Sequence, residues 1–201
     1  VSQPSVAIDD EGQIIVAWLE NLESGNALYV KQWTGSAWIQ LGEDLRVDKN
    51  LSTHSPSLVL ASTGNPVLAW GENEEKSPFG GQLHVKQWNG TSWVNVGNAI
   101  GERAGSPSLA LDSKDNPVLA WAEANSTFNA ASILVRRWDG NAWQSVGAAL
   151  NTGFGRVPSL RVDASDKPVV AWEEWDAVNN IYVKRFDGKD WLPVGNFLDT
   201  A

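Results

Sequence analysis

Short stretches in which hydrophobic and polar residues alternate, separated by polar turns, run along the whole chain. In one such pair, residues 107–112 (PSLALD) are followed by a polar turn and then by residues 117–121 (PVLAW). A third stretch, residues 133–138, leads through the Asp-Gly pair at 139–140 to a fourth at 142–146. Runs of this length, bounded by Pro, Asp, Asn or Gly, are typical of β-strands. No segment has the 3.6-residue period and end caps of a helix. The pattern predicts four antiparallel strands in about 50 residues.

The same pattern occurs four times along the chain. Pro-Ser pairs begin at residues 4, 56, 107 and 158, and Ala-Trp pairs begin at residues 17, 69, 120 and 171, so both markers recur every 51 or 52 residues. A fixed period of this size is typical of repeat architectures, and four antiparallel strands are the unit of a β-propeller blade. The sequence therefore predicts an all-β fold, one propeller domain of four four-stranded blades. The expected blades cover residues 1–50, 51–101, 102–152 and 153–201.

The expected blades can close in more than one way. A closed four-bladed ring, and hence a monomer, is favoured. A dimer that forms an eight-bladed ring and a segment of a larger ring are the alternatives, since propellers have typically 4 to 8 blades. The chain begins with Val and contains no Met, which indicates a processed product or a piece of something longer.

The turn between strands three and four of each repeat contains a Gly. The residue pairs are Thr34-Gly35, Asn89-Gly90, Asp139-Gly140 and Asp187-Gly188. Asn-Gly and Asp-Gly supply the positive φ that a two-residue hairpin turn requires. A two-residue turn at 89–90 would place Lys86 opposite Trp93, so that Lys86, Trp88 and Trp93 share one face of the hairpin. We expect such aromatic and cationic sets to stack on the next blade.

Eleven of the 12 tryptophans occupy three repeated positions. They are Trp18, Trp70, Trp121 and Trp172 at the end of strand two, Trp33, Trp88 and Trp138 at the end of strand three, and Trp38, Trp93, Trp143 and Trp191 at the start of strand four. Phe186 takes the strand-three position in the last repeat. A position repeated in every blade is best explained by packing, so these side chains are expected in the core.

A glutamate follows each strand-two tryptophan by two residues, and therefore lies on the same face of the strand. The four residues are Glu20, Glu72, Glu123 and Glu174. We expect each to pair with the strand-three cation of its blade, namely Lys31, Lys86, Arg136 or Lys184. The alternative is a ring of carboxylates that binds a ligand or a hard cation such as Ca²⁺ through oxygen. The ion pair is favoured, so neither a metal nor another cofactor is expected.

The composition excludes several classes of partner and chemistry. The chain has no Cys, which rules out disulfides, thiolate metal sites and a cysteine nucleophile. The formal charge of −9 opposes binding to nucleic acid and to anionic lipid. No apolar run approaches the length of a membrane helix, so no membrane insertion is expected. The fold must be held by packing.

Catalytic residues are not apparent in the repeat pattern. His54 is expected in a linking segment, and His84 takes a position that Tyr29, Leu134 and Tyr182 occupy in the other repeats. Neither histidine has the setting of a positioned base. The sequence therefore predicts no catalytic residue, and the chain is not expected to be an enzyme.

Four of the aromatic residues outside the repeat pattern lie in the segments that vary most between copies. They are Phe79, Phe128, Phe154 and Trp175. Loops between strands two and three and between successive repeats emerge on one side of a propeller. Exposed rings there suit stacking on sugars or anchoring a protein partner. They are the candidate ligand-binding residues, and the alternative is that they cap the loops.

The combined pattern, P-S-L-x-L-D-x-x-G-N-P-V-x-A-W followed by V-K-x-W-N-G-x-x-W-x-x-V-G, resembles repeats of secreted and cell-surface bacterial β-propellers. The Asp-Gly turns also loosely resemble the Asp-box of sialidases and the tryptophan-marked blades of propeller lectins. A sialidase would require an arginine triad and a tyrosine nucleophile, whereas Tyr29 and Tyr182 share one repeat position.

The resemblance implies a secreted or cell-surface protein. It also implies a non-catalytic recognition module that binds a glycan or a protein through its variable loops. The alternative is a structural or adhesive repeat segment of a longer surface protein. A glycoside-processing enzyme ranks third.

Overall fold

The computed structural model describes all residues of the chain except 10, 24, 75–80, 176–177 and 199–201. The described part contains sixteen β-strands and no helix, so it holds no helix that could span a membrane. The strands fall into four consecutive units of four. Unit 1 is β1 (Ser2–Ile8), β2 (Ile14–Leu22), β3 (Gly25–Trp33) and β4 (Trp38–Gln40). Unit 2 is β5 (Ser52–Leu60), β6 (Pro66–Asn73), β7 (Gly81–Trp88) and β8 (Trp93–Asn95). Unit 3 is β9 (Ile100–Leu111), β10 (Pro117–Ala124), β11 (Ala131–Trp138) and β12 (Trp143–Ser145). Unit 4 is β13 (Phe154–Val162), β14 (Pro168–Trp175), β15 (Asn179–Phe186) and β16 (Trp191–Pro193).

Within each unit the strands pair antiparallel in chain order. Units 1 and 4 form separate four-stranded sheets, and units 2 and 3 are joined in one eight-stranded sheet. The junction exists because β9 begins early and its first residues pair with β7, with Gly81 opposite Ala104 and Leu83 opposite Ile100. The long β9 also crosses the expected boundary between residues 101 and 102. The all-β prediction is confirmed for the described residues.

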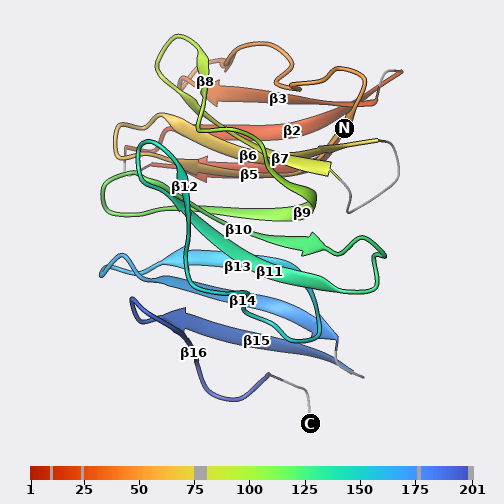
Figure 1. The fold of residues 1–201 in the computed structure, drawn as a ribbon. Helices are drawn as coiled ribbons and strands as arrows, with labels where there is room; N and C mark the ends of the chain where they lie inside the picture. Colours follow the sequence, from red (N-terminus) through yellow and green to blue (C-terminus); the bar gives the residue numbers. More distant parts are fainter. Residues whose placement is uncertain (10, 24, 75–80, 176–177, 199–201) are drawn as a thin grey trace.

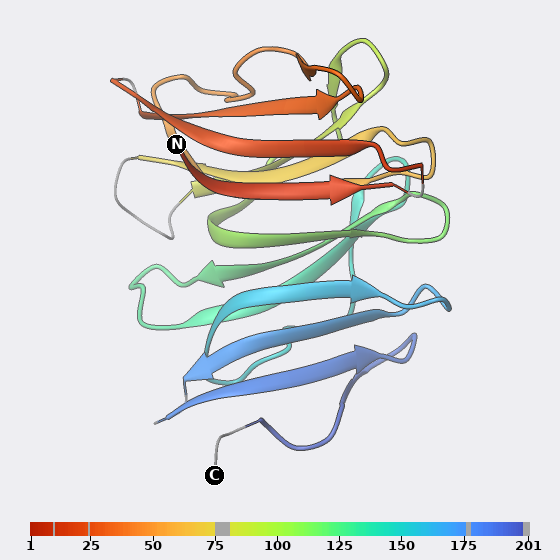
Figure 2. The same ribbon diagram turned by 180° about the vertical axis from the view of Figure 1, so that it is seen from behind.

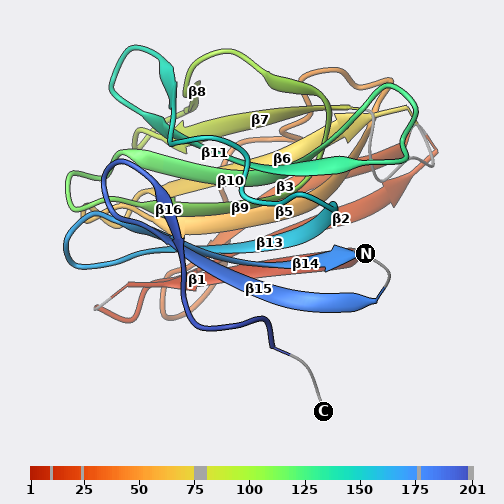
Figure 3. The same ribbon diagram turned by 60° about the horizontal axis from the view of Figure 1, so that its bottom comes forward.

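The four units are stacked in chain order and do not close on themselves. Unit 1 lies at one end of the stack and unit 4 at the other, as both side views show (Figures 1 and 2). Figure 3 brings the last unit toward the viewer, with β14, β15 and β16 at that end. The expected closed ring of four blades is therefore wrong for this arrangement, because the first and last units are not in contact in these views.

The turns between strands three and four are longer than expected. In unit 2, Trp88 lies opposite Trp93 and Lys86 lies opposite Asn95. Four residues connect the strands, because the Asn89 side chain accepts the main-chain N–H groups of Thr91 and Ser92 at 3.0 and 2.9 Å. The glycine within the turn has a φ of 97°. The predicted two-residue turn is thus wrong, because the turn has four residues and Trp93 pairs with Trp88 instead of Lys86. The side chains of Lys86, Trp88 and Trp93 still share one face.

The prediction that the repeated tryptophans form the core is confirmed for three of the eleven, whereas seven are partly buried and Trp38, at one end of the stack, is 46% exposed. Trp70, Trp121 and Trp172 are fully buried at the interfaces between units. A strand-three cation lies over each strand-two tryptophan ring, as with Lys86, whose ammonium is 5.7 Å from the Trp70 ring centre. The strand-four tryptophans pack on the preceding unit rather than on the next one. Burial of these large rings between successive sheets holds the stack together.

Each first strand contains an irregularity just before its Pro-Ser pair. The residues at this position are Gln3, Ser55, Ser106 and Val157, all with φ between 47° and 52°. Such a bulge bends a strand and increases its twist. The bulge divides each first strand into two parts. The residues after the bulge pack between units, and the residues before it lie next to the variable loops. In unit 4 those first residues carry Phe154 and Arg156.

Candidate functional site

The ends of three neighbouring strands in unit 4 place aromatic and polar side chains on one face. Phe154 of β13 lies opposite Trp175 of β14, and Trp175 lies opposite Asn179 of β15. Arg156 lies two residues along β13 and opposite Glu173. Because directly opposed residues and residues two apart share a face of a sheet, all five side chains lie on the same face.

Arg156 carries the positive charge of this face. Its guanidinium donates a hydrogen bond to the side-chain oxygen of Asn179 at 3.2 Å and lies 3.3 Å from a carboxylate oxygen of Glu173. Both members of this ion pair are partly exposed, so solvent screens the pair and its contribution to stability is small. The Nε atom of Arg156 is buried without a hydrogen-bond partner. The pair therefore orients two groups of opposite charge at the surface more than it stabilises the fold.

Unit 3 contributes the opposite wall through the loop after β10. Asn125 organises this loop, since its side-chain oxygen accepts the main-chain N–H groups of Thr127 and Asn129 at 3.2 Å each. Its amide nitrogen also donates to the side chain of Asn129 at 2.7 Å. Phe128 is held at a φ of 55° and is exposed. Hydrogen bonds of the loop thus present an aromatic ring and an amide to solvent.

These walls enclose a cavity of about 470 Å³, which we call the aromatic pocket. It is lined by Phe128, Asn129, Phe154, Arg156, Trp175 and Asn179. The structure thus brings together three of the four aromatic residues that the sequence singled out. Phe79 lies outside the described residues. A role for these rings in ligand binding stays a prediction.

The polar residues of the aromatic pocket were not found from the sequence. One signal was present, because Glu173 follows the strand-two tryptophan at a position that holds Leu19, Gly71 and Ala122 in the other units. A carboxylate at a position that is otherwise apolar marks unit 4 as different. Arg156 could be placed beside Glu173 only once the pairing of β13 with β14 was known.

The glutamates that follow the strand-two tryptophans are bound by N–H groups of their surroundings. Glu72 accepts the indole N–H of Trp70 at 2.8 Å and the main-chain N–H groups of Val47 and Asp48 at 2.6 and 3.0 Å. Glu123 accepts the N–H groups of Trp121, Glu102 and Arg103, and Glu174 accepts those of Trp172, Thr152 and Gly153. Glu72 and Glu174 thus connect their own units to the segments that link them to the preceding units, whereas Glu123 is bound by the first part of β9 in its own unit. The expected ion pair with the strand-three cation is replaced by these bonds, since the cation lies over the tryptophan ring.

Glu20 differs from the other three glutamates. It is exposed at the end of the stack, where no linking segment from a preceding unit covers it. The four carboxylates therefore lie in separate units with three of them already hydrogen-bonded. Among the described residues no group of three or more His, Asp or Glu is arranged to hold a metal ion.

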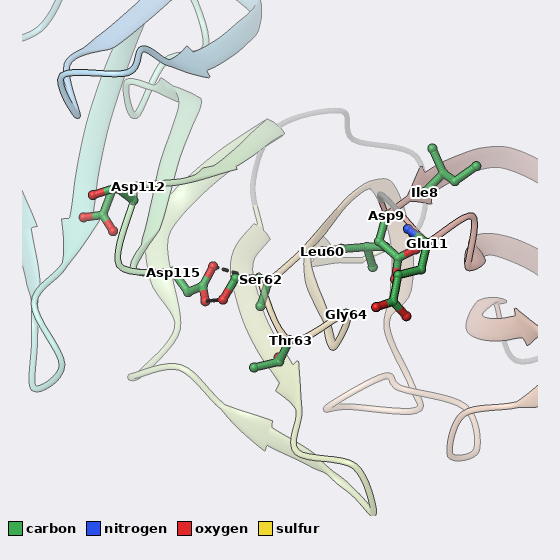
Figure 4. A pocket seen from close by; sticks show the side chains of 11 residues that line it. Ile8, Asp9, Glu11, Leu60, Ser62, Thr63, Gly64, Asp112 and Asp115 are labelled. Carbon is green, nitrogen blue, oxygen red and sulfur yellow. Dashed lines mark hydrogen bonds between the residues drawn. The ribbon is translucent and has the colours of Figure 1, made fainter.

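A second cavity, of about 600 Å³, lies at the turns between strands one and two of units 1 to 3 (Figure 4). It is acidic, and two of its carboxylates have partners that belong to the fold. Asp115 accepts hydrogen bonds from the main chain and hydroxyl of Ser62 at 2.9 and 2.5 Å, and Asp112 accepts the N–H groups of Lys114 and Asn116. These bonds shape the turns and connect unit 3 to unit 2, so these two carboxylates serve the fold.

Both histidines are enclosed in unit 2. His54 lies in β5 rather than in a linking segment, and its buried Nε2 has no hydrogen-bond partner. His84 stacks on Trp70, with ring centres 5.7 Å apart, and its Nε2 lies 3.9 Å from the Glu72 carboxylate. Burial lowers the pKa of each histidine below its ordinary value of 6.5, although the nearby Glu72 carboxylate acts in the opposite direction. Both are therefore neutral packing groups at neutral pH.

Comparison with known proteins identifies the fold but not a family. No family model matches the sequence, and no curated protein is similar to it. Among solved structures, a protein of unknown function from Dyadobacter fermentans is similar, with 13% identity, a TM-score of 0.67, and coverage of 94% of this chain and 68% of that one.

Two enzymes are also similar in structure. A sialidase from Trypanosoma rangeli, solved with 2,3-difluorosialic acid as a covalent intermediate, has 16% identity and a TM-score of 0.64 over 94% of this chain and 36% of its own. An ulvan lyase, from a family of polysaccharide lyases, has 12% identity and a TM-score of 0.64 over 95% of this chain and 54% of its own. The chain thus spans about one third to one half of these two enzymes. At this identity the likeness shows a β-propeller-like fold.

These neighbours contradict the prediction of a non-catalytic module that is not an enzyme. That prediction relied on assigning the repeated residues to the core and on finding no catalytic motif in the repeats. Enzymes with a similar fold show that such a fold is compatible with catalysis. The absence of a motif from the repeats therefore does not exclude an enzyme.

Proposed function

We propose that this chain acts on carbohydrate and that the aromatic pocket is where the sugar binds. The observation that carries the proposal is the meeting of three non-repeated aromatic rings with an arginine and two asparagines around one cavity. Binding sites for small ligands are concave and largely apolar, with a few polar groups that fix orientation. The cavity volume of about 470 Å³ lies within the range of such sites.

The lining suits the chemistry of a sugar ring. A pyranose has an apolar face of C–H groups, which packs on an exposed aromatic ring such as Trp175, and a rim of hydroxyl groups. The side chains of Asn129 and Asn179 can each donate to and accept from hydroxyl groups. Trp175 and Phe128 expose large apolar rings to water. A bound ligand would cover these rings and remove the unfavourable exposure.

Arg156 and Glu173 favour an acidic sugar. A guanidinium recognises a carboxylate through paired N–H donors. In an elimination beside a sugar carboxylate, a base removes the proton from the carbon next to the carboxylate, a C=C bond forms, the bond from the next carbon to the leaving sugar oxygen breaks, and that oxygen takes a proton from water. Glu173, which lies beside the pocket lining and 3.3 Å from Arg156, would be the base, and Arg156 would be the cation that offsets the negative charge. Hydrolysis by the two-carboxylate route would take a second acidic group at the pocket. We therefore propose an acidic polysaccharide or oligosaccharide as the substrate, with Arg156 as its carboxylate partner and Glu173 as the base.

The fold supplies the setting for this site. We propose that the four units are blades of a β-propeller, so that the aromatic pocket lies at the end of the blades from which the variable loops emerge. Loops carried on a rigid scaffold are where binding residues commonly lie, and enzymes with similar structures support carbohydrate chemistry on such a fold. A secreted or cell-surface location would match an extracellular polysaccharide substrate.

The proposal is tested by incubating the chain with ulvan and with sialylated oligosaccharides and separating the products by chromatography. We expect cleavage of one acidic substrate, with Glu173→Gln lowering kcat at least about tenfold and Arg156→Gln raising KM more than it lowers kcat. The matched control is Glu43→Gln, which replaces an exposed carboxylate in the segment between β4 and β5, far along the chain from Arg156, and should leave both constants unchanged.

Two results would contradict the proposal. One is cleavage that is as fast with Glu173→Gln as with the wild-type chain, which would place the base elsewhere. The other is the absence of both binding and cleavage for acidic and neutral sugars alike, which would remove carbohydrate as the ligand. Far-UV circular dichroism of each variant would show whether the fold is retained.

A further inference from the structure

Successive units pack through two different faces of their sheets. We call the side that contacts the preceding unit the leading face and the side that contacts the following unit the trailing face. At the junction of units 1 and 2, the trailing face contributes Leu28, Leu41 and Leu45, and the leading face contributes Leu58 and Trp93. Equivalent residues form the core between units 2 and 3 and between units 3 and 4. The stack therefore uses one type of joint three times.

A tryptophan marks every joint on its leading side. The indole N–H groups of Trp93, Trp143 and Trp191 donate to the main-chain carbonyls of Leu41, Val96 and Val146 of the preceding units, at 2.8, 3.0 and 2.8 Å. A glycine follows each acceptor and lies against the indole. A Cβ added at Gly42, Gly97 or Gly147 would lie only 2.8 to 2.9 Å from that ring. The indole thus occupies the space that a side chain at the glycine would fill.

A serine marks every joint on its trailing side. The hydroxyl oxygens of Ser5, Ser57 and Ser108 accept the main-chain N–H groups of Leu58, Leu109 and Leu160 of the following units, at 3.2, 2.9 and 2.9 Å. These serines belong to the Pro-Ser pairs that revealed the repeat. The joint is thus defined by three elements, namely an indole bond, a glycine contact and a serine bond.

Each end of the stack exposes one of the two faces that form this joint, the leading face in unit 1 and the trailing face in unit 4. In unit 1, Val6 has 66% of its surface exposed, whereas the equivalent Leu58 of unit 2 has 6%. Trp38, the equivalent of Trp93, is 46% exposed. In unit 4, Leu198 is 60% exposed and Val194 is also exposed, whereas the equivalent Leu45 and Leu41 of unit 1 are buried.

The exposed halves match each other residue by residue. Gly195, the equivalent of Gly42, has nothing within 4 Å of an added Cβ, so the space for an indole is open. The preceding carbonyl, that of Val194, corresponds to the acceptors of the three inner joints. Ser159 is exposed and corresponds to the serines that accept a strand-one N–H group. Unit 1 offers the indole and unit 4 offers the glycine, the carbonyl and the serine.

We propose that the trailing face of unit 4 binds the leading face of unit 1 of a second copy of this chain. The contact continues the three joints that already exist within the chain, with Trp38 against Gly195 and Val6 against Val194 and Leu198. Because the two faces differ, the contact is head to tail, and it either closes into a ring or continues as an open chain of copies. Two copies would complete eight units, which is within the size range of propellers.

The surface chemistry supports a copy of the same chain as the occupant. Both faces are apolar over the residues that the inner joints bury, and such contiguous apolar surface marks an interaction site. Equivalent side chains are already buried against each other at three joints within this chain. Another protein would have to reproduce a tryptophan, a glycine turn and a serine at the same spacing, whereas a second copy carries all of them.

The first test is the mass of the chain in solution, measured by light scattering over a range of concentrations. We expect a mass of at least twice the chain mass of 21.8 kDa. Val6→Asp and Val194→Asp should each reduce the chain to a monomer, and Trp38→Ala should weaken association at least about tenfold. The melting of each isolated monomer should stay close to that of the others, because the three side chains are exposed in a single copy.

Mixing the two blocked variants tests the direction of the contact. Val6→Asp leaves an intact trailing face and Val194→Asp leaves an intact leading face, so an equimolar mixture should form a dimer with one joint although neither variant associates alone. A wild-type chain that is monomeric at every concentration would overturn the proposal. A dimer that survives Val194→Asp would also overturn it, because that result indicates a contact between two leading faces.

This inference does not depend on the proposed function. Trp175→Ala should remove sugar binding and leave the mass in solution unchanged, since the side chain is not part of the repeated joint. Trp38→Ala should lower the mass in solution and leave sugar binding to a single copy unchanged. Failure of either experiment therefore leaves the other proposal standing.

Discussion

The repeated and the non-repeated aromatic residues of this chain have opposite surroundings. Trp70, Trp121 and Trp172 are buried, each with its indole N–H bonded to a glutamate two residues later and a cation over its ring. Phe128 and Trp175 are exposed and line a cavity. Both groups are large and apolar, so hydrophobicity alone does not separate them.

The difference lies in what surrounds each ring. A side chain at a repeated position contacts equivalent neighbours in successive units, and these neighbours fit it. An aromatic side chain that occurs only once has no equivalent set of neighbours, and it lies in a loop that differs from the equivalent loops of the other units. Repetition along the chain is therefore a guide to packing, and departure from repetition is a guide to the surface on which function is built.

The largest effect is expected from the repeated core. Trp121→Ala removes a buried indole at the joint between units 2 and 3 and leaves Glu123 without one of its donors. The free energy of unfolding should fall by about 3 to 5 kcal/mol. Denaturant unfolding monitored by circular dichroism measures it, and a loss below about 1 kcal/mol would show that the joint does not depend on this ring.

A smaller loss is expected at the glutamate that binds the indole. Glu72→Ala leaves the buried indole N–H of Trp70 and two partly buried main-chain N–H groups without their acceptor, which should cost about 2 to 3 kcal/mol. Glu20→Ala is the matched control, since Glu20 is exposed and should change stability by less than about 0.5 kcal/mol. The comparison should be made well above the histidine pKa. Equal losses at the two positions would mean that the linking segment contributes nothing.

The sequence was sufficient for the all-β class, for the four-stranded units and for the three fully buried tryptophans. The Pro-Ser and Ala-Trp markers gave the strands and the units, because each marker sits at a point where backbone geometry or packing restricts the residue type. It was not sufficient for the turn register, since the Asn89 side chain replaces main-chain bonds and lengthens the connection to four residues. A local pair such as Asn-Gly does not reveal which of its groups closes the turn.

Only part of the aromatic pocket could be predicted, because some of its residues are selected by sequence and others only by the fold. The aromatic rings could be selected because they break the repeat. Arg156, Asn129 and Asn179 could not, since they join the pocket only through the pairing of three strands and the fold of the loop after β10. The prediction of a closed ring was wrong, because the number of repeats in a chain does not determine the angle between successive sheets.

A pH effect is expected from the enclosed histidines. Because burial lowers the pKa of His84 in the folded state below the ordinary value of 6.5, the unfolded chain binds more protons as the pH falls. Stability should therefore be complete above 6.5 and decrease as the pH falls through that value. His84→Tyr, the residue that units 1 and 4 carry at this position, should reduce the loss, as measured by melting at several pH values. A melting temperature of the wild-type chain that does not fall in this range would contradict the burial effect.

The smallest effect on stability is expected at the aromatic pocket. Trp175→Ala removes an exposed ring that the packing does not use, so the free energy of unfolding should change by less than about 0.5 kcal/mol. The same denaturant titration used for Trp121→Ala measures it. A loss comparable to that of Trp121→Ala would show that the non-repeated ring belongs to the core after all.

The most direct test of the carbohydrate proposal is calorimetric titration of an acidic oligosaccharide released from ulvan into the wild-type chain and into Trp175→Ala. We expect saturable binding to the wild-type chain and at least about tenfold weaker binding to the folded variant, because the ring supplies the stacking surface. Binding of equal affinity to both proteins would contradict sugar binding at Trp175, since it would place the sugar outside the aromatic pocket.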